Sequence, residues 1–136
     1  MNQLLGDTSY WVALVSRQDQ HRAQALKLTA ALRNERIVTT DVVLIEFLNF
    51  LCRHDPHLRR AALGLTRQLL EQDNVEVVRL SPELFEAGLL LYERWNDKRW
   101  SQTDCISIAL MRQRGISTAL TADHHFEQAG FTILLK

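Results

Sequence analysis

Four carboxylates occupy positions where a side chain could do chemistry: Asp7, Glu46, Asp104 and Asp123. Asp7 directly follows a short apolar run near the start of the chain, and Asp123 follows another near its end. In open parallel sheets, ligand sites lie beyond the carboxyl ends of the strands, so acids at two such ends suggest a site. Each acid taken alone is also an ordinary helix cap or turn residue, and that alternative stays open.

Glu46 lies inside a helical segment, residues 42–53, that is apolar nearly all round. Such a helix is expected to be buried on most faces. A buried carboxylate costs several kcal/mol unless it is paired or binds a cation. The helical spacing places Glu46 on one stripe with Asn49 and Arg53, so this stripe could instead face solvent or form an ion pair.

Asp104 opens a further apolar helix and shares a face with Ser107. An acid in the first turn is favourable to the helix dipole, which is an ordinary structural role. The two polar residues could equally form a small polar spot in an apolar helix. Asp104 on its own therefore leaves a structural and a chemical interpretation open.

Convergence of these acids would be more informative than any one of them. Carboxylates brought together without a cation repel one another and are partly protonated. Carboxylate oxygens are ligands that suit Mg²⁺ or Mn²⁺. A divalent ion lowers the pKa of its bound water and stabilises charge on the attacking and leaving oxygens of a phosphodiester. The sequence contains no G-x-S-x-G, H-E-x-x-H or Walker phosphate loop that would indicate other chemistry.

Composition sets further limits. The chain has 136 residues, which predicts a single domain over residues 1–136. Its apolar runs are too short for a membrane span, and its start lacks the basic and apolar regions of a secretory signal. A cytoplasmic protein without a membrane segment is therefore expected. Sixteen basic and sixteen acidic residues give a net charge of zero, which excludes nucleic-acid binding by bulk charge alone.

Short apolar runs alternate with longer helical patterns along the chain. Strands are expected at residues 3–6, 37–39, 75–80, 117–121 and 131–135. Helices are expected at residues 9–16, 20–34, 42–53, 56–72, 82–95, 104–114 and 124–128, with Thr103 capping the sixth. Strands separated by helices predict an α/β fold with a parallel sheet and helices on both of its faces.

Three other features have two interpretations each. Basic residues interleave with aromatic ones around residues 92–100, and Arg94, Lys98 and Arg99 could contact single-stranded RNA there. The aromatic residues could instead pack into the core. The helices at residues 20–34 and 58–72 carry more Leu and Ala than one small core needs, which predicts a partner or self-association surface or simple core packing. Of His124 and His125, one is expected to cap the short last helix and the other to be solvated.

Taken in order, these elements resemble the PIN-domain family, and in particular its small VapC-like ribonuclease toxins. The resemblance covers essentially the whole chain. It rests on Asp7-Thr8-Ser9, on Glu46 in the third helix, on Thr103-Asp104-Cys105-Ile106-Ser107, and on residues 121–131. The last segment, an acid followed by Phe126 and then Gly130-Phe131, is the most specific. Tyr10 and Trp11 are bulkier than the family pattern suggests, a departure that bears on the shape of the substrate groove and not on the acids.

The resemblance implies a three-layer α/β/α sandwich around a central parallel sheet of about five strands. It implies a metal-dependent endoribonuclease that hydrolyses RNA, with Asp7, Asp104 and Asp123 holding Mg²⁺ or Mn²⁺. Glu46 would complete the shell or orient the attacking water, and Ser9 and Thr121 would support the cluster. It also implies a homodimer and a cognate antitoxin. The alternative is a non-catalytic partner-binding or regulatory module on the same scaffold.

Overall fold

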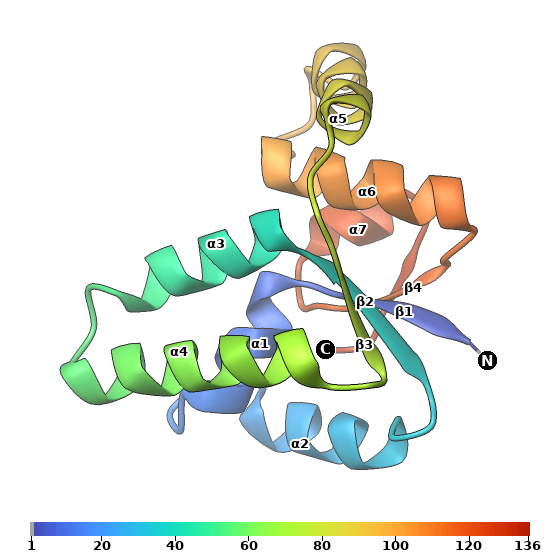
Figure 1. Cartoon of the computed structure of the whole chain (residues 1–136). Coiled ribbons are helices and arrows are strands. Elements are labelled where there is room, and N and C mark those ends of the chain that lie inside the picture. The colour runs from blue at the N-terminus through green and yellow to red at the C-terminus, as the bar shows by residue number, and fades with distance from the viewer. Residues whose placement is uncertain (1) are drawn as a thin grey trace.

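Strands and helices alternate along the whole of the described chain (Figure 1). The computed structural model describes residues 2–136. The five strands are β1 (Gln3–Gly6), β2 (Arg36–Thr40), β3 (Val75–Val78), β4 (Thr118–Leu120) and β5 (Thr132–Ile133). The helices are α1 (Thr8–Val15), α2 (Arg22–Ala31), α3 (Asp41–Leu51), α4 (Pro56–Glu71), α5 (Pro82–Arg94), α6 (Gln102–Arg114) and α7 (His124–Gln128). None of the helices in this range has both the length and the hydropathy that a membrane crossing requires.

All five strands run parallel in one sheet with the order β3-β2-β1-β4-β5. The chain moves outward from β1 to β3 and then crosses back to place β4 on the other side of β1. Leu5 is therefore in register with Val38 of β2 and with Ala119 of β4. The direction of winding reverses between β1 and β4, and the crevice beyond such a reversal is where open α/β sheets bind ligands. The predicted parallel α/β sheet is confirmed.

Alternation of side chains along the strands builds two separate cores. Leu4 and Ile37 pack with α1, α3 and α4, whereas Leu5 and Val38 pack with α5, α6 and α7. Figure 1 shows α1, α2 and α4 on one side of the sheet and α6 and α7 on the other, with α5 beyond α6. The predicted three-layer sandwich is therefore confirmed.

The composition of helix α3 predicted burial on most faces, but the structure shows a helix with one buried side. Its buried side is formed by Val43, Leu44, Phe47 and Leu51. Ile45 and Phe50 are 56% and 54% exposed. The helix extends away from the sheet (Figure 1), and its outer face is exposed at these two residues.

The exposed apolar side chains are distributed differently from the prediction. Helices α2 and α4 expose Leu26, Leu63 and Leu70, but much of their remaining apolar surface is covered. A larger group lies on α5, which rests mainly on α6. It consists of Phe85, Leu89, Leu90 and Tyr92. The excess of apolar surface is therefore greater on α3 and α5 than on the helices that the sequence singled out.

Candidate active site

The four predicted carboxylates come from four different elements and line one cleft of about 400 Å³. Asp7 follows β1, Asp123 follows β4, Asp104 lies in the first turn of α6, and Glu46 projects from the middle of α3. The cleft lies at the carboxyl edge of the sheet, where β1 and β4 are neighbours. The four acids are distant in the sequence, so tertiary packing and not local structure brings them together.

Asp7 occupies the N-cap position of α1, but its side chain makes no capping hydrogen bond. It is buried, and its Oδ2 accepts a hydrogen bond of 2.8 Å from the Thr121 hydroxyl. Burial raises the pKa of Asp7 to about 7; the Thr121 hydrogen bond opposes this shift, and the charges of Asp104 and Glu46 add to it. The helix-cap interpretation therefore fails for Asp7, and its carboxylate sits where ionisation is unfavourable without a cation.

Asp104 has both of the roles that the sequence left open. Its backbone N–H donates to the Ser101 hydroxyl at 3.0 Å, and its Oδ2 accepts from the Ser101 N–H at 3.1 Å, which forms a capping box. Ser101 and not Thr103 therefore begins the helix, because the Ser-x-x-Asp pair satisfies two free donors reciprocally. Burial raises the pKa of Asp104, and the nearby charge of Asp123 adds to this effect.

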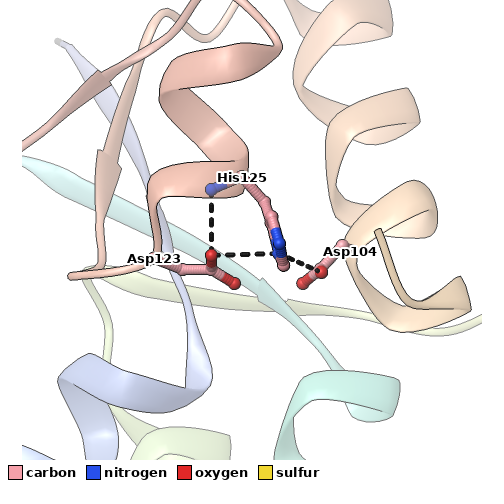
Figure 2. A group of neighbouring side chains, drawn as sticks. All are labelled: Asp104, Asp123 and His125. Atoms are coloured by element: carbon pink, nitrogen blue, oxygen red, sulfur yellow. Dashed lines mark hydrogen bonds and ion pairs between the residues drawn. The ribbon is translucent and has the colours of Figure 1, made fainter. Parts of the chain in front are cut away.

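Asp123 and Asp104 hold the ring of His125 between them (Figure 2). The His125 Nδ1 atom lies 3.1 Å from Asp123 Oδ1 and 3.3 Å from Asp104 Oδ2. Asp123 also caps α7 by accepting a 2.9 Å hydrogen bond from the His125 N–H.

The expectation for the two histidines is wrong, because an aspartate caps α7 and His125 lies in the cleft. His124 is exposed beside Glu127, as expected for a solvated residue. The sequence did contain an indication of the position of His125. A residue two positions after an N-cap aspartate lies in the first turn of the helix, beside that carboxylate.

Hydroxyl groups connect the ends of β1 and β4. Ser9 Oγ lies 3.0 Å from Thr121 Oγ1 and accepts from the Ala122 N–H at 3.0 Å. Thr121 Oγ1 also accepts from the Asp123 N–H at 3.0 Å. The Thr8 hydroxyl donates to Glu46 Oε1, a contact that the sequence analysis missed although Thr8 directly follows Asp7. The Thr121 hydroxyl therefore contacts Asp7 directly, whereas Ser9 contacts Thr121 and the backbone that follows β4.

The donor atoms fit a divalent cation. Ligand atoms of Asp104, Asp123 and His125 all lie within 4.8 Å of one another. Asp7 lines the same cleft at a more buried position. The carboxylate oxygens are ligands that suit Mg²⁺ or Mn²⁺, whereas an imidazole nitrogen is more typical of a transition-metal site. A cation would favour ionisation of Asp7 and Asp104, which burial and the neighbouring acids oppose.

The three basic residues predicted to contact RNA do not all line the same cleft. Arg99 lines the acidic cleft, and Lys98 and Arg99 line a neighbouring cleft of about 590 Å³ together with Tyr92. Arg94 lies instead over the Trp95 ring, with its Cζ 5.3 Å from the ring centroid.

The aromatic residues of this segment divide between core and surface. Trp100 is buried, and its Nε1 donates to Gln128 Oε1 at 3.0 Å. Core packing is therefore the correct interpretation for Trp100, whereas Tyr92 is 55% exposed. Tyr10 and Trp11 are both buried in the core, so their bulk does not obstruct the cleft.

Comparison with known proteins agrees with this geometry. Residues 4–132 match the family model of the PIN domain. The 23S rRNA-specific endonuclease VapC20 of Mycobacterium tuberculosis is 31% identical over 128 residues, which cover 92% of each chain. The crystal structure of M. tuberculosis VapC20, a sarcin–ricin loop cleaving toxin, gives a TM-score of 0.84 at 29% identity, covering 95% of this chain and 96% of that chain. VapBC2 from Rickettsia felis, solved with a DNA fragment, has the same fold at a TM-score of 0.68 and 13% identity, covering 96% of both chains. The chain therefore belongs to the PIN domain family.

Proposed function

We propose that this protein is an endoribonuclease that hydrolyses RNA phosphodiester bonds with bound Mg²⁺ or Mn²⁺. The observation that carries the proposal is the convergence of Asp7, Glu46, Asp104 and Asp123 in one cleft at the reversal point of the sheet. Asp7 is a buried carboxylate with a pKa near 7, and no cationic side chain of residues 2–136 is bonded to it, so it is costly to maintain. A cation-dependent reaction gives that arrangement a function.

Each residue of the cleft has a role in this proposal. Asp7, Asp104 and Asp123 hold the cation directly or through water, and His125 provides a further nitrogen beside two of them. The cation, when bound, lowers the pKa of a water molecule and stabilises charge on the phosphodiester. Glu46, fixed by the Thr8 hydroxyl, orients the attacking water. Thr121 and Ser9 hold Asp7 and the start of α7 in place.

The proposal extends to substrate and partner. Because VapC20 is a 23S rRNA-specific endonuclease and a sarcin–ricin loop cleaving toxin, we take this loop of 23S rRNA as the first substrate to test. A nuclease that cut ribosomal RNA would damage the cell that makes it, so we include a cognate antitoxin protein that blocks the site. A cytoplasmic, single-domain, homodimeric protein completes the proposal.

Cleavage of RNA by the purified protein tests the proposal. We expect discrete fragments from total RNA, and from an oligonucleotide containing the sarcin–ricin loop, with Mg²⁺ or Mn²⁺ but not with EDTA. Asp104→Asn should abolish these fragments, whereas His124→Ala, a change at an exposed histidine outside the cleft, should not. Absence of cleavage, together with no change of melting temperature on adding either metal, would contradict the proposal and favour a non-catalytic partner-binding module.

A further inference from the structure

A second groove opens from the acidic cleft along α3. It is lined by α3 and by Thr103 in the first turn of α6, and has a volume of about 530 Å³. Ile45, Asn49 and Phe50 of α3 line this groove, and Arg53 lines it just beyond the end of the helix; we call it the α3 groove. It shares two lining residues, Glu46 and Phe50, with the acidic cleft. The groove therefore continues the cleft outward and is not a separate cavity.

The acidic cleft has a second continuation. The cleft that contains Tyr92 and Lys98 shares Arg99 and Ser101 with the acidic cleft. Both grooves therefore adjoin the acidic cleft, and each groove contains one exposed aromatic ring and at least one basic side chain. Phe50 is 54% exposed and Tyr92 is 55% exposed.

We propose that the α3 groove binds the single-stranded RNA segment on one side of the scissile phosphate, with Phe50 stacking on a base and Arg53 contacting a backbone phosphate. This inference rests on the proposed function and extends it from the reacting phosphate to the path of the substrate. The RNA would pass from the α3 groove over the acids and into the groove of Tyr92 and Lys98.

The chemistry of the α3 groove favours nucleic acid. Aromatic rings beside basic side chains bind single strands because bases stack on the rings while the cations neutralise phosphates. The Phe50 ring lies 5.5 Å from the His54 ring, centroid to centroid, at an interplanar angle of 41°. Arg53 is exposed, and no carboxylate of residues 2–136 lies within ion-pair distance of its guanidinium. A free guanidinium can make bidentate contacts with a phosphate.

A protein partner would use the same surface differently. Ile45 lies on the same helix, lines the same groove, and is as exposed as Phe50. An apolar contact with a second copy or another protein would bury both side chains. An RNA base would stack on Phe50 only, because Ile45 has no aromatic face. This pair of residues therefore separates the two kinds of occupant.

The test measures binding of a fluorescein-labelled single-stranded RNA of about 12 nucleotides, within the range of known single-strand sites. Fluorescence anisotropy is recorded with Mg²⁺, using protein that carries Asp104→Asn to prevent cleavage. We expect Phe50→Ala to weaken binding about tenfold, and Phe50→Trp to restore it. Ile45→Ala should change binding less than about twofold. Equal loss from Phe50→Ala and Ile45→Ala, or no loss from either, would overturn the proposal.

Salt dependence tests the role of Arg53. Arg53→Gln should weaken binding and reduce the slope of log affinity against log salt by about 0.7, the value for one phosphate contact with a single strand. Arg67→Gln on α4 is the matched control, since this exposed arginine lines none of the clefts described above, and it should leave the slope unchanged. An unchanged slope in Arg53→Gln would remove the phosphate contact from the proposal.

Two outcomes separate this inference from the proposed function. If the native protein cleaves RNA and the Phe50 and Arg53 variants bind as well as native protein, the inference fails and the nuclease assignment stands. If the Phe50 and Ile45 variants both convert a dimer to a monomer and RNA binding is unchanged, the α3 groove is an interface between copies. If the native protein neither binds nor cleaves RNA, both proposals fail together.

Discussion

Two carboxylates of this protein have opposite environments. Glu76, the second residue of β3, accepts hydrogen bonds from Arg114 at 2.8 and 2.7 Å and from Arg36 at 3.2 Å. The hydrogen bonds with Arg114 lower the pKa of Glu76 to about 2, although partial burial opposes this shift. Asp7, at the other end of the strands, is bonded to a hydroxyl and has a pKa raised to about 7.

The difference between the two acids is the charge of their hydrogen-bond partners. Glu76 is bonded to two guanidinium groups, whereas Asp7 is bonded to a neutral hydroxyl. Arg36 begins β2 and Arg114 ends α6, so Glu76 joins two strands and a helix as a satisfied ion cluster. Asp7 lies among other acids, with burial and their charges both opposing its ionisation. The first arrangement is complete within the protein, and under the proposed function a cation from solution would complete the second.

Substitution of Asp7 should have the largest effect on cleavage. Asp7→Asn removes one charged ligand without changing the size of the side chain. We expect metal-dependent cleavage to fall by about a thousandfold, because a bound metal supplies several kcal/mol of transition-state stabilisation. Initial rates on the sarcin–ricin oligonucleotide at saturating Mg²⁺ measure the effect. Cleavage that stays within about tenfold of native would remove Asp7 from the site.

The same substitution should stabilise the protein when no metal is present. An ordinary aspartate has a pKa of 3.8, and Asp7 in the folded state has one of about 7. Ionisation therefore destabilises the folded state increasingly between these two pH values, and the penalty is constant above pH 7. Asp7→Asn removes a penalty of about 4 kcal/mol at neutral pH and none below pH 3.8. Melting temperatures in EDTA should diverge as the pH rises, and parallel curves for the two proteins would contradict the raised pKa.

Changing the partner of Asp7 sharpens the comparison. Thr121→Val keeps the shape but removes the hydroxyl that donates to the Asp7 carboxylate and accepts from the Asp123 N–H. Loss of a group that orients a metal ligand typically costs 10- to 100-fold, so we expect a decrease of about 30-fold in cleavage. Thr39→Val is the control, because Thr39 is equally buried and donates only to the Gly6 carbonyl. If both variants lose activity equally, the effect belongs to the sheet and not to Asp7.

Substitution of Glu76, whose carboxylate is fully paired with arginines, should have the smallest effect. Glu76→Gln should lower stability by about 1 kcal/mol at neutral pH, the scale of a partly exposed ion pair, and leave cleavage unchanged. The sign is opposite to that of Asp7→Asn. Because the folded pKa of Glu76 is depressed, its contribution is present above pH 4.5 and disappears as the pH falls toward 2. Denaturant unfolding of both proteins at neutral and acidic pH measures this difference; a stability gain at neutral pH would contradict it.

Much of the fold followed from the pattern of the sequence. The predicted bounds of β1 and α7 agree with the structure, because Gly6 and Asp7 end one element and Asp123 begins the other. The bounds of α6 were less accurate, because Ser101 and Asp104 form a reciprocal cap that extends the helix by two residues. Helix α3 was expected to be buried, but burial depends on which layers surround a helix, and composition does not specify them.

The site was predictable where acids follow strands and less so where neighbours are distant in sequence. Asp7, Asp104 and Asp123 could be identified because strand ends and helix starts are recognisable. The contact of Thr8 with Glu46 joins α1 to α3 across 38 residues, and no local pattern indicates it. The place of His125 between two carboxylates depends on how α7 faces α6, which is set by tertiary packing.

The pairing of β1 with β4 determines when activity can appear during folding. Thr121 and Asp7 are separated by 114 residues, so their hydrogen bond closes one of the longest loops in the chain. Contacts of such high sequence separation form late and slowly, because loop-closure entropy must be overcome before they contribute. Recovery of cleavage after dilution from denaturant should therefore lag behind recovery of helical signal. Catalysis in this protein reports on the step of folding that brings the two ends of the chain together.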